Sequence, residues 1–411
     1  MPKFQRMLEC LPEQLREAAA QIKEKCKALG YEAYIVGGAV RDMLLKTGIS
    51  DVDITVVGDT GKLAGALDGS FGYEIKTHPS FMTVNVSIKG GYSLDIATAR
   101  REVYTNPASL PMVYPSNIYD DLKRRDFTIN AMAVSLDGFE LLDFFGGFGD
   151  LQRGLIKVLH EKSFVDDPTR ILRGIRLEKR YGFRMDEKTE KLMKDSIRKG
   201  YPLRLSSDRL LNEIELILSQ PQFLSLVRRM EETGLWKAIS GERAVPPSTF
   251  LKLERVRKCD SDKRLLFRVL ALIEDTPNER VAALFERHIS RYKKLMAYRN
   301  RENHLQLPVK KKPLENEMLY ELFSEIDEEI LEYLYASAET ECFRKNITAY
   351  IQRIKDFKFY FDGNTLKSIG VEPGPRYKSL LGRARQKAVE RNITDRENQI
   401  YLLKEMLKKG E

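Results

Sequence analysis

Short apolar runs separated by turns dominate the first 145 residues, after a stretch with helical spacing at 11–29. These β-rich runs cover residues 31–36, 52–57, 73–77, 82–88 and 93–97. Beyond residue 150 the apolar positions recur every three or four residues, which is typical of amphipathic helices. The clearest such segments are 166–182, 187–199, 207–219 and 221–234. The pattern predicts an α+β protein, with a small mixed-sheet domain followed by an all-helical C-terminal two-thirds.

The chain has 411 residues, 42% of them hydrophobic, which is ample for a sizeable core and too long for one compact domain. Clusters of Gly, Pro and polar residues mark candidate domain breaks at 240–249, 305–313 and 362–375. We therefore expect two to four domains.

No apolar run approaches the roughly 20 residues that a membrane-spanning helix needs. The first ten residues carry charges where a signal peptide has its apolar segment. The four cysteines lie far apart and form no Cys-x-x-Cys pair, which argues against structural zinc and a disulfide framework. They are Cys10, Cys26, Cys259 and Cys342. These features predict a cytoplasmic protein without a membrane partner.

Charge is distributed unevenly along the chain. Residues 1–150 carry 16 Lys and Arg against 20 Asp and Glu, a net charge of −4. The other 261 residues carry 53 against 40, a net charge of +13. An acidic part joined to a basic part is what an enzyme acting on a polyanion needs. A moderately basic helical surface is the alternative, and we favour nucleic-acid binding.

A glycine pair follows the first β-rich run. Gly37 and Gly38 allow a tight turn and let the backbone approach a ligand without interference from a Cβ atom. Residues 39–45 then have the pattern of a short helix, and the amides at a helix N-terminus favour a phosphate group. An ordinary turn is the alternative for the glycine pair taken alone.

Asp51 and Asp53 lie two residues apart in the next predicted strand. Side chains at i and i+2 of a strand share a face, so both carboxylates can bind one ion or ion pair. Such hard oxygen ligands suit Mg²⁺ that bridges substrate phosphates. An Asp-x-Asp pair alone is common and usually faces solvent. The order of strand, glycine pair, helix and Asp-x-Asp strand is far more specific, and it indicates nucleotidyl transfer.

Asp95 lies in a further β-like run. A third carboxylate is what a two-metal site needs to hold the ion that activates an attacking hydroxyl. An edge-strand aspartate without such a role fits the sequence equally well. The residues that follow, 100–111, have the composition of a loop.

A charged segment precedes an apolar run at 127–134. Arg125 carries the guanidinium fork that pairs with phosphates. Asp126 and Asn130 are four residues apart, so on a helix they would share a face and meet a ribose. The alternative is a solvated charge run that caps an apolar helix at 127–134, and the charge pattern alone favours it.

Pro168 occupies the first turn of another predicted helix, with an aspartate near its cap. Asp167, Arg170 and Arg173 follow at steps of three along one face, with Arg176 to its side. A carboxylate and a guanidinium complement the amine and ring nitrogen of cytosine and adenine, whereas uracil and guanine present the opposite polarity. The alternative is a capping aspartate with exposed salt bridges, worth a few tenths of a kcal/mol.

Five sequence blocks carry a resemblance to a known family. They are Gly37-Gly38-Ala-Val-Arg41-Asp42 with Asp51-Val-Asp53, Arg124-Arg125-Asp126-Phe-Thr-Ile-Asn130-Ala-Met-Ala, Asp143-Phe-Phe-Gly146-Gly147-Phe-Gly-Asp150-Leu, Asp166-Asp167-Pro-Thr-Arg170 and Leu205-Ser206-Ser-Asp-Arg209-Leu-Leu-Asn-Glu213. In this order, over about half of the chain, they resemble the class II tRNA nucleotidyltransferases. These are the CCA-adding enzymes and their bacterial poly(A) polymerase relatives.

The resemblance implies four domains. They are a polymerase-β-like catalytic head at 1–155, a helical neck that recognises the base at 156–240, a helical body at 241–340 and a tRNA-binding tail at 341–411. It also implies roles for the predicted site residues. Asp51 and Asp53 hold two Mg²⁺ ions, and Gly37, Gly38, Arg41, Arg125, Asp126 and Asn130 belong to the blocks that hold the nucleotide. Asp167, Arg170, Arg173 and Arg176 bind and select its base, while Arg209 and Glu213 support the neck.

The implied activity is template-independent transfer of a nucleotide to the 3′ end of tRNA, with release of pyrophosphate. We add the hypothesis that Asp95 helps the metal to activate the 3′-hydroxyl. The segments around Asp95 and His160 resemble the branch that adds only the terminal adenosine from ATP. That branch often has extra N-terminal domains, and Asp166 stands where the family usually has glutamate. Addition of CC or CCA with CTP, polyadenylation, and a catalytically silent RNA-binding scaffold are the alternatives.

Overall fold

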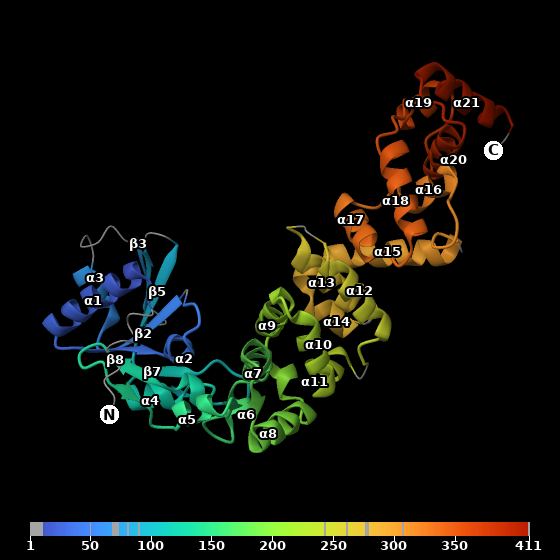
Figure 1. Cartoon of the computed structure of the whole chain (residues 1–411). Helices are drawn as coiled ribbons and strands as arrows, with labels where there is room; N and C mark the ends of the chain where they lie inside the picture. The colour runs from blue at the N-terminus through green and yellow to red at the C-terminus, as the bar shows by residue number, and fades with distance from the viewer. Residues whose placement is uncertain are drawn as a thin grey trace. The chain divides into compact units, whose positions relative to one another are not determined.

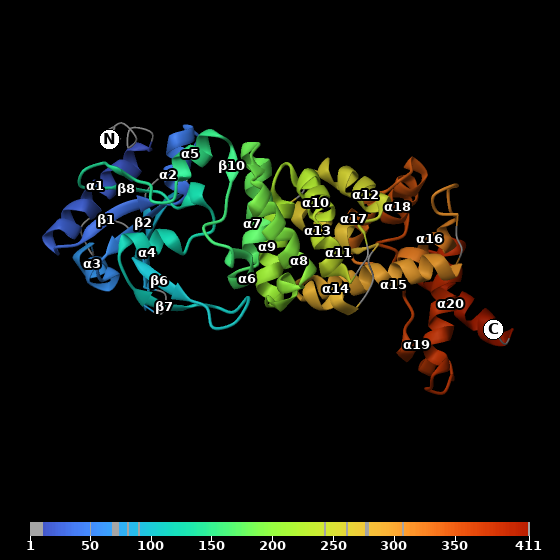
Figure 2. The ribbon, with the colours of Figure 1, turned by 90° about the horizontal axis from the view of Figure 1, so that it is seen from below.

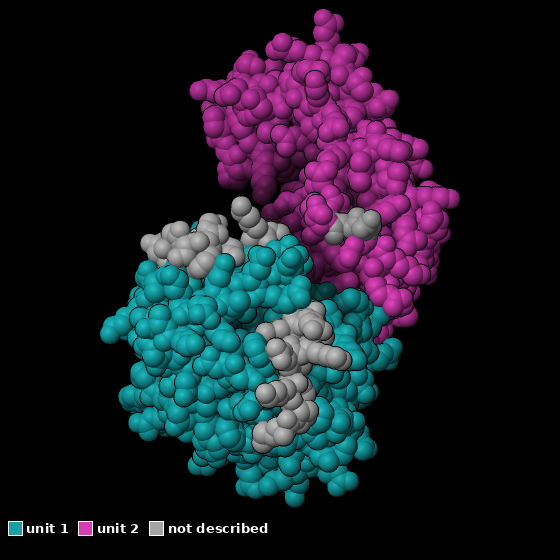
Figure 3. Space-filling model, turned by 60° about the vertical axis from the view of Figure 1, so that its left-hand side comes forward, with its two compact units in different colours: residues 1–242 teal, residues 243–411 magenta. Residues whose placement is uncertain are grey.

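The computed structural model describes residues 11–49, 51–67, 74–79, 82–88, 91–241, 244–259, 262–275, 279–305 and 308–409. The chain forms two compact units, residues 1–242 and 243–411 (Figure 3). Each unit has its own fold. The unit boundary falls within the predicted break at 240–249, whereas the four-domain division stays a prediction.

A seven-stranded sheet organises the first unit, with the strand order β3-β4-β5-β2-β1-β8-β9 (Figure 1). The strands are β1 (Glu32–Val36), β2 (Asp51–Val57), β3 (Glu74–His78), β4 (Thr83–Ile88), β5 (Tyr92–Thr98), β8 (Ala133–Ser135) and β9 (Leu141–Leu142). Within this sheet the described strands pair antiparallel except β2 and β5, which run parallel. The five β-rich runs predicted from sequence thus correspond to β1 to β5.

One face of the sheet carries the main core of this unit. Val52, Ile54 and Ile96 are buried, and strand β5, which bears Ile96, packs with α1 (Glu13–Ala28) and α3 (Thr60–Leu67). Alternate residues of a strand point to opposite faces, so Asp51 and Asp53 project to the other side, where both are exposed. The same alternation that forms the core therefore presents the carboxylates to solvent.

On the second face of the sheet, a small core lies over β1 and β8. This core includes Tyr34, Val36, Leu122 and Ala133, and it involves helix α4 (Ile118–Lys123). Helix α5 (Gly147–Gln152) packs against the 3₁₀ turn Thr128–Asn130. The predicted apolar helix at 127–134 is therefore wrong, because Ala133–Ser135 pairs with β1 as strand β8. A short apolar run does not distinguish a buried strand from a helix, and long-range strand pairing decided the outcome.

The loop predicted at 100–111 is also only partly correct. β6 (Arg100–Val103) and β7 (Met112–Pro115) form a separate antiparallel ribbon, which lies beside α4 (Figure 2). Both strands are largely exposed, so neither has the apolar alternation that marks a strand with one buried face.

Helices form the rest of the first unit, as the sequence predicted. They are α6 (Ser163–Asp166), α7 (Thr169–Tyr181), α8 (Glu187–Arg198), α9 (Ser207–Ser219), α10 (Phe223–Glu232) and α11 (Leu235–Ser240). The two-residue strands β10 (Leu155–Ile156) and β11 (Arg184–Met185) pair in parallel and link the segment before α6 to the end of α7. Helices α7, α9 and α10 pack on one another through buried leucine, isoleucine and valine side chains.

The second unit is helical throughout its described residues. Its helices are α12 (Pro247–Arg257), α13 (Arg264–Ile273), α14 (Glu279–Leu284), α15 (Ile289–Leu305), α16 (Asn316–Phe323), α17 (Glu328–Ser337), α18 (Glu341–Arg353), α19 (Gly363–Ser368), α20 (Arg376–Glu390) and α21 (Arg396–Lys408). The break predicted at 362–375 contains α19, so that segment is not simply a linker. No described helix is both long and apolar enough to cross a membrane. Cys26 and Cys342 are free thiols, and Cys10 lies outside the described residues.

Candidate active site

The turn between β1 and α2 (Gly38–Leu45) requires glycine. Gly37 has a φ of +70°, and a Cβ atom on it would lie 2.6 Å from Nη1 of Arg125. A Cβ atom on Gly38 would approach Nη2 of Arg41 to 3.3 Å. The backbone of this turn therefore lies directly against two guanidinium groups, and a side chain at Gly37 would displace one of them.

The three predicted carboxylates project from neighbouring strands. β2 and β5 pair with Asp53 opposite Asp95 and Asp51 opposite Ser93, so all three share one face of the sheet. Oδ1 of Asp95 accepts a hydrogen bond of 2.6 Å from Nδ2 of Asn85, and Oδ1 of Asp51 accepts one of 3.3 Å from Oγ of Ser93. The parallel register thus brings residues 42 positions apart into one acidic group.

Asp53 lies at the centre of this group. Although Asp53 keeps an exposed surface, the protein atoms around its carboxyl group displace solvent and raise its pKa. The charge of Arg125 opposes that change, and the charges of Asp95 and Asp51 add to it. A bound cation would relieve this repulsion. Among the described residues, no group of three or more His, Cys, Asp and Glu side chains has the arrangement of a metal site. The donor set instead fits a hard cation that takes one or two carboxylates and completes its shell with phosphate and water oxygens.

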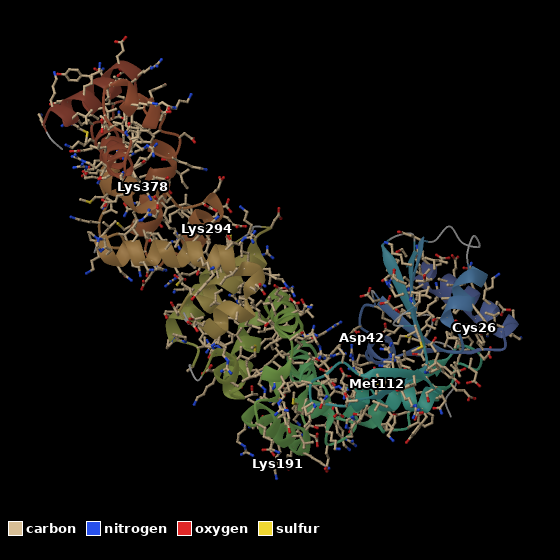
Figure 4. All side chains as sticks on the ribbon, turned by 180° about the vertical axis from the view of Figure 1, so that it is seen from behind. Cys26, Asp42, Met112, Lys191, Lys294 and Lys378 are labelled. Atoms are coloured by element: carbon tan, nitrogen blue, oxygen red, sulfur yellow. The ribbon has the colours of Figure 1, made fainter. Side chains whose placement is uncertain are left out.

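Three side chains fix the guanidinium of Arg41, which is only 5% exposed. Nε donates to Oδ1 of Asp42 at 2.9 Å, Nη1 donates to Oδ1 of Asn130, and Nη2 donates to the hydroxyl of Tyr181 at 2.7 Å. The guanidinium carbon lies 4.7 Å from the centre of the Tyr181 ring. Figure 4 labels Asp42, which belongs to this cluster. Tyr181, at the end of α7, carried no signal in the sequence.

Asp126 and Asn130 contact each other at a 3₁₀ turn, whereas the sequence placed them on one face of an α-helix. Nδ2 of Asn130 donates to Oδ1 of Asp126 at 3.0 Å, and Nη2 of Arg173 lies 2.9 Å from Oδ2. Burial alone would raise the pKa of Asp126, but Arg173 and Asn130 hold that pKa below its usual value. The aspartate therefore stays charged and joins this segment to helix α7.

Arg125 is oriented by a residue that sequence analysis missed. Asp121 is fully buried and accepts hydrogen bonds from Nη2 of Arg125 at 2.9 Å and from Nη2 of Arg124 at 2.8 Å. Burial would raise the pKa of Asp121, yet the two arginines lower it below the usual value. The buried carboxylate thus holds two cations beside the acidic group. Its position four residues before Arg125 was the available signal.

Asp167 is held in place by several donors. Its Oδ1 accepts from the amide and hydroxyl of Thr169 at 3.1 and 2.7 Å, and from Nη2 of Arg209 at 2.9 Å. Arg170 is buried, and its guanidinium donates to Oγ of Ser163 at 2.8 Å and to the carbonyl of Arg124 at 2.7 Å. Two residues, Thr169 and Arg209, therefore fix Oδ1 of Asp167.

Arg176 has a different setting. Its Nη2 donates to Oε2 of Glu213 at 3.0 Å, and it lines a small cavity of about 140 Å³ that also contains Arg41 and Asp126. Arg209 and Glu213 from α9 thus each hold one residue of the predicted base-selecting set.

A cavity of about 550 Å³ brings most of the predicted residues together. Its lining includes Gly38, Arg41, Asp53, Arg125, Asp126, Asn130, Asp167, Arg170 and Arg173. Asp95 lines a second cavity of about 440 Å³, which shares Asp53 and Arg125 with the first. Gly37, Asp51 and Arg176 do not line either of these two cavities. The whole arrangement belongs to the first unit.

Known proteins share this fold and these sequence blocks. Residues 33–157 match the model of the poly A polymerase head domain, and residues 182–242 match a model described as a probable RNA and SrmB-binding site of polymerase A. A solved structure of a CCA-adding enzyme in an apo form is 30% identical, with a TM-score of 0.76 and 99% of each chain covered. The chain belongs to the family of tRNA nucleotidyltransferases and poly(A) polymerases.

Two curated members of this family are A-adding tRNA nucleotidyltransferases. The protein of Geobacter sulfurreducens is 34% identical over 85% of this chain, and that of Aquifex aeolicus is 44% identical over 47% of it. The chain spans only 42% and 24% of the length of these two relatives. Membership of the family confirms the resemblance carried by the five blocks, and the mixed-sheet head with an all-helical remainder confirms the predicted fold class.

Proposed function

We propose that this chain transfers a nucleotide to the 3′ end of tRNA without a template and releases pyrophosphate, and that the nucleotide is the terminal adenosine from ATP. The observation that carries the proposal is the position of Asp53. Its carboxylate is shared by a basic cavity, which gathers the phosphate- and base-binding candidates, and by the cavity that contains Asp95. That arrangement suits transfer of one nucleotidyl group from a triphosphate in the first cavity to an acceptor in the second.

The chemistry follows from the charges around Asp53. The oxygen of the 3′-hydroxyl bonds to the α-phosphorus, the bond from that phosphorus to the bridging oxygen breaks, and pyrophosphate leaves with the electron pair. The proton of the hydroxyl passes to the carboxylate of Asp95. Arg125 stabilises the phosphate charge, while Arg41 holds the glycine turn in place through Asn130 and Tyr181.

Asp51 and Asp53 would hold Mg²⁺. When bound there, such an ion neutralises phosphate charge and acidifies the attacking hydroxyl. Two exposed carboxylates on one face of β2, with phosphate oxygens to complete the shell, fit its preference for hard ligands.

Asp167 and Arg170 are the candidates for base selection, with Arg173 beside them in the same cavity. Oδ2 of Asp167 suits an exocyclic amine, which adenine and cytosine present and uracil lacks. Selection of adenine over cytosine is supported by the A-adding relatives. Full CCA addition, CC addition and polyadenylation remain the alternatives within the class.

The basic helices beyond residue 150 are proposed to grip the acceptor arm through its phosphates, in the cytoplasm where tRNA matures. Lys294 and Lys378, labelled in Figure 4, are two of the cations in the second unit. Binding through phosphates weakens steeply with salt, with a slope near −0.9 per neutralised phosphate in a duplex.

The decisive experiment offers tRNAs that end before C74, at C74, at C75 and at A76, each with one labelled nucleoside triphosphate. Incorporation of AMP only onto the C75 end supports A-addition, whereas CMP incorporation onto the shorter ends contradicts it. The double variant Asp51→Ala with Asp53→Ala should abolish Mg²⁺-dependent pyrophosphate release. Unchanged pyrophosphate release by the double variant would contradict the catalytic assignment. If the wild type itself released no pyrophosphate, a catalytically silent RNA-binding scaffold would be favoured.

A further inference from the structure

A row of polar side chains crosses the open half of the sheet. Lys76 on β3 lies opposite Asn85 on β4, Asn85 lies opposite Asp95 on β5, and Asp95 lies opposite Asp53 on β2. Residues that pair in register share a face of the sheet, so this row projects away from the apolar core. His78 and Thr83 form the start of the next row on the same face.

The residues of this row are accessible to solvent and line a cavity. The Lys76 side chain is 61% exposed, and Asp95 and His78 are exposed as well. Lys76, His78, Thr83, Asn85, Asp95 and Asp53 all line the cavity of about 440 Å³. Helices α1 and α3 cover the other face of these strands, where Val84, Val86 and Ile96 are buried.

The geometry of in-line displacement suggests a role for the cavity that contains Asp95. The attacking and leaving oxygens must lie on opposite sides of the α-phosphorus. With the triphosphate in the cavity of Gly38 and Arg125, the attacking hydroxyl has to arrive from the other side of Asp53, where the polar row begins.

We propose that the open face of β3, β4 and β5 binds the 3′-terminal nucleotide of the acceptor RNA, with Lys76 contacting its phosphodiester and Asn85 positioning Asp95. This inference rests on the proposed nucleotidyl transfer and adds the residues that receive the acceptor. It makes the edge strand β3 part of RNA recognition, although none of the five sequence blocks includes it.

The contacts of Asn85 and Lys76 suit these two roles. Nδ2 of Asn85 donates to Oδ1 of Asp95 at 2.6 Å, which fixes one carboxylate oxygen and leaves Oδ2 for the acceptor hydroxyl. Nζ of Lys76 lies 3.1 Å from Oε1 of Glu74, and both side chains are more than 60% exposed. An exposed ion pair of this kind is worth at most about 1 kcal/mol, so a phosphate can replace the glutamate.

The test compares Lys76→Ala with Lys62→Ala, which removes an exposed lysine from α3 on the covered side of the sheet. The substrate is a tRNA transcript that ends at C75, with labelled ATP and Mg²⁺. We expect Lys76→Ala to raise the KM for this tRNA about 3- to 10-fold, with the KM for ATP unchanged. The slope of log KM against log salt should fall by about 0.7, the contribution of one contact to single-stranded RNA. Lys62→Ala should match the wild type.

Asn85→Ala tests the positioning role, with Ser87→Ala as the control on the same strand and face. Asn85→Ala should lower kcat about 10- to 100-fold while leaving the KM for ATP and the melting temperature near those of the wild type. Ser87, which lies outside the lining of the cavity, should tolerate the change.

The outcomes separate this inference from the proposed function. If the wild type incorporates AMP and Lys76→Ala behaves as Lys62→Ala does, the acceptor site is wrong while the function stands. A rise in the KM for ATP, with the KM for tRNA unchanged, would assign this face to the incoming nucleotide and also overturn the inference. An inactive wild type would contradict the proposed function itself.

Discussion

The hydroxyl of Tyr181 donates a hydrogen bond of 2.6 Å to Oδ1 of Asp42 and accepts one of 2.7 Å from Nη2 of Arg41. Tyr181 ends α7, the helix that begins beside Asp167, whereas Asp42 and Arg41 belong to the helix that follows the glycine turn. One phenol group therefore ties helix α7, proposed to select the base, to the glycine turn proposed to bind phosphate.

Tyr181→Phe removes this hydroxyl and keeps the ring against Arg41. Hydrogen bonds to charged groups contribute about 1.5–3 kcal/mol, so we expect a lower melting temperature and a KM for ATP raised roughly 3- to 10-fold. Tyr201→Phe is a matched control, because its ring also lies near a guanidinium, that of Arg204 at 5.1 Å. Steady-state kinetics and thermal unfolding of both variants provide the comparison. Equal behaviour of the two would show that the phenol bridge does not position the turn.

Gly37→Ala should inactivate the enzyme through crowding rather than through backbone strain alone. Gly37 and Gly30 have nearly the same φ, +70° and +71°, but only the Cβ at residue 37 would meet Arg125, at 2.6 Å. Both alanine variants carry a backbone penalty of about 1–2 kcal/mol. We expect Gly30→Ala to keep its kcat and Gly37→Ala to lose more than about tenfold, since one ångström of misplacement costs that much or more. Similar losses in both variants would assign the effect to strain.

Arg209→Lys should relax the choice of base. Lysine keeps the charge but not the two-pronged contact, in which Nη2 donates to Asp167 and Nη1 donates to the carbonyl of Ala108, both at 2.9 Å. A less firmly held Asp167 should distinguish less well between bases. A decrease of about 1.4 kcal/mol in the free-energy difference between correct and incorrect nucleotides corresponds to tenfold more misincorporation from UTP or GTP relative to ATP. Arg198→Lys, on the exposed side of α8, is the control. Unchanged discrimination would mean that Arg209 only stabilises the neck.

His160 should make the protein less stable as the pH falls from about 6.5 to about 4. Burial, followed by the charges of Arg170, Lys123 and Lys162, lowers the pKa of His160 from 6.5 to about 4. In this window the unfolded chain binds a proton that the folded chain does not, so stability is present above the unfolded pKa and is lost on acidification. In His160→Gln, the melting temperature should depend less on pH between about 4 and about 6.5 than it does in the wild type. An identical slope in both proteins would contradict the assignment.

The sequence predicted the strands that carry the carboxylates because buried apolar residues alternate with the exposed carboxylates there. Alternation at Val52, Ile54 and Val56 marks β2 and places Asp51 and Asp53 opposite the core. The ribbon of β6 and β7 has no such buried face, so its residues looked like a loop. Local pattern thus predicts an element well when burial shapes that pattern.

The candidate site was predictable where short motifs carry it and not where distant residues meet. Asp126 and Asn130 are close in sequence, whereas Tyr181 reaches Asp42 across 139 positions and Arg209 reaches Asp167 across 42. Such supporting contacts depend on how α7 and α9 pack, and packing is set by the whole fold. Periodicity shows that a helix has an apolar face but not which partner that face meets.

The parallel pairing of β2 with β5 also constrains how the protein folds and how it tolerates change. Asp53 and Asp95 face one another only when two strands separated by the β3–β4 hairpin have joined in one register. A slip of one residue would turn Asp95 toward the apolar face, so the acidic group forms completely or not at all. A nascent chain therefore forms no complete acidic group until this long-range pairing is in place. An insertion between these strands that shifts the register would therefore disperse the acidic group.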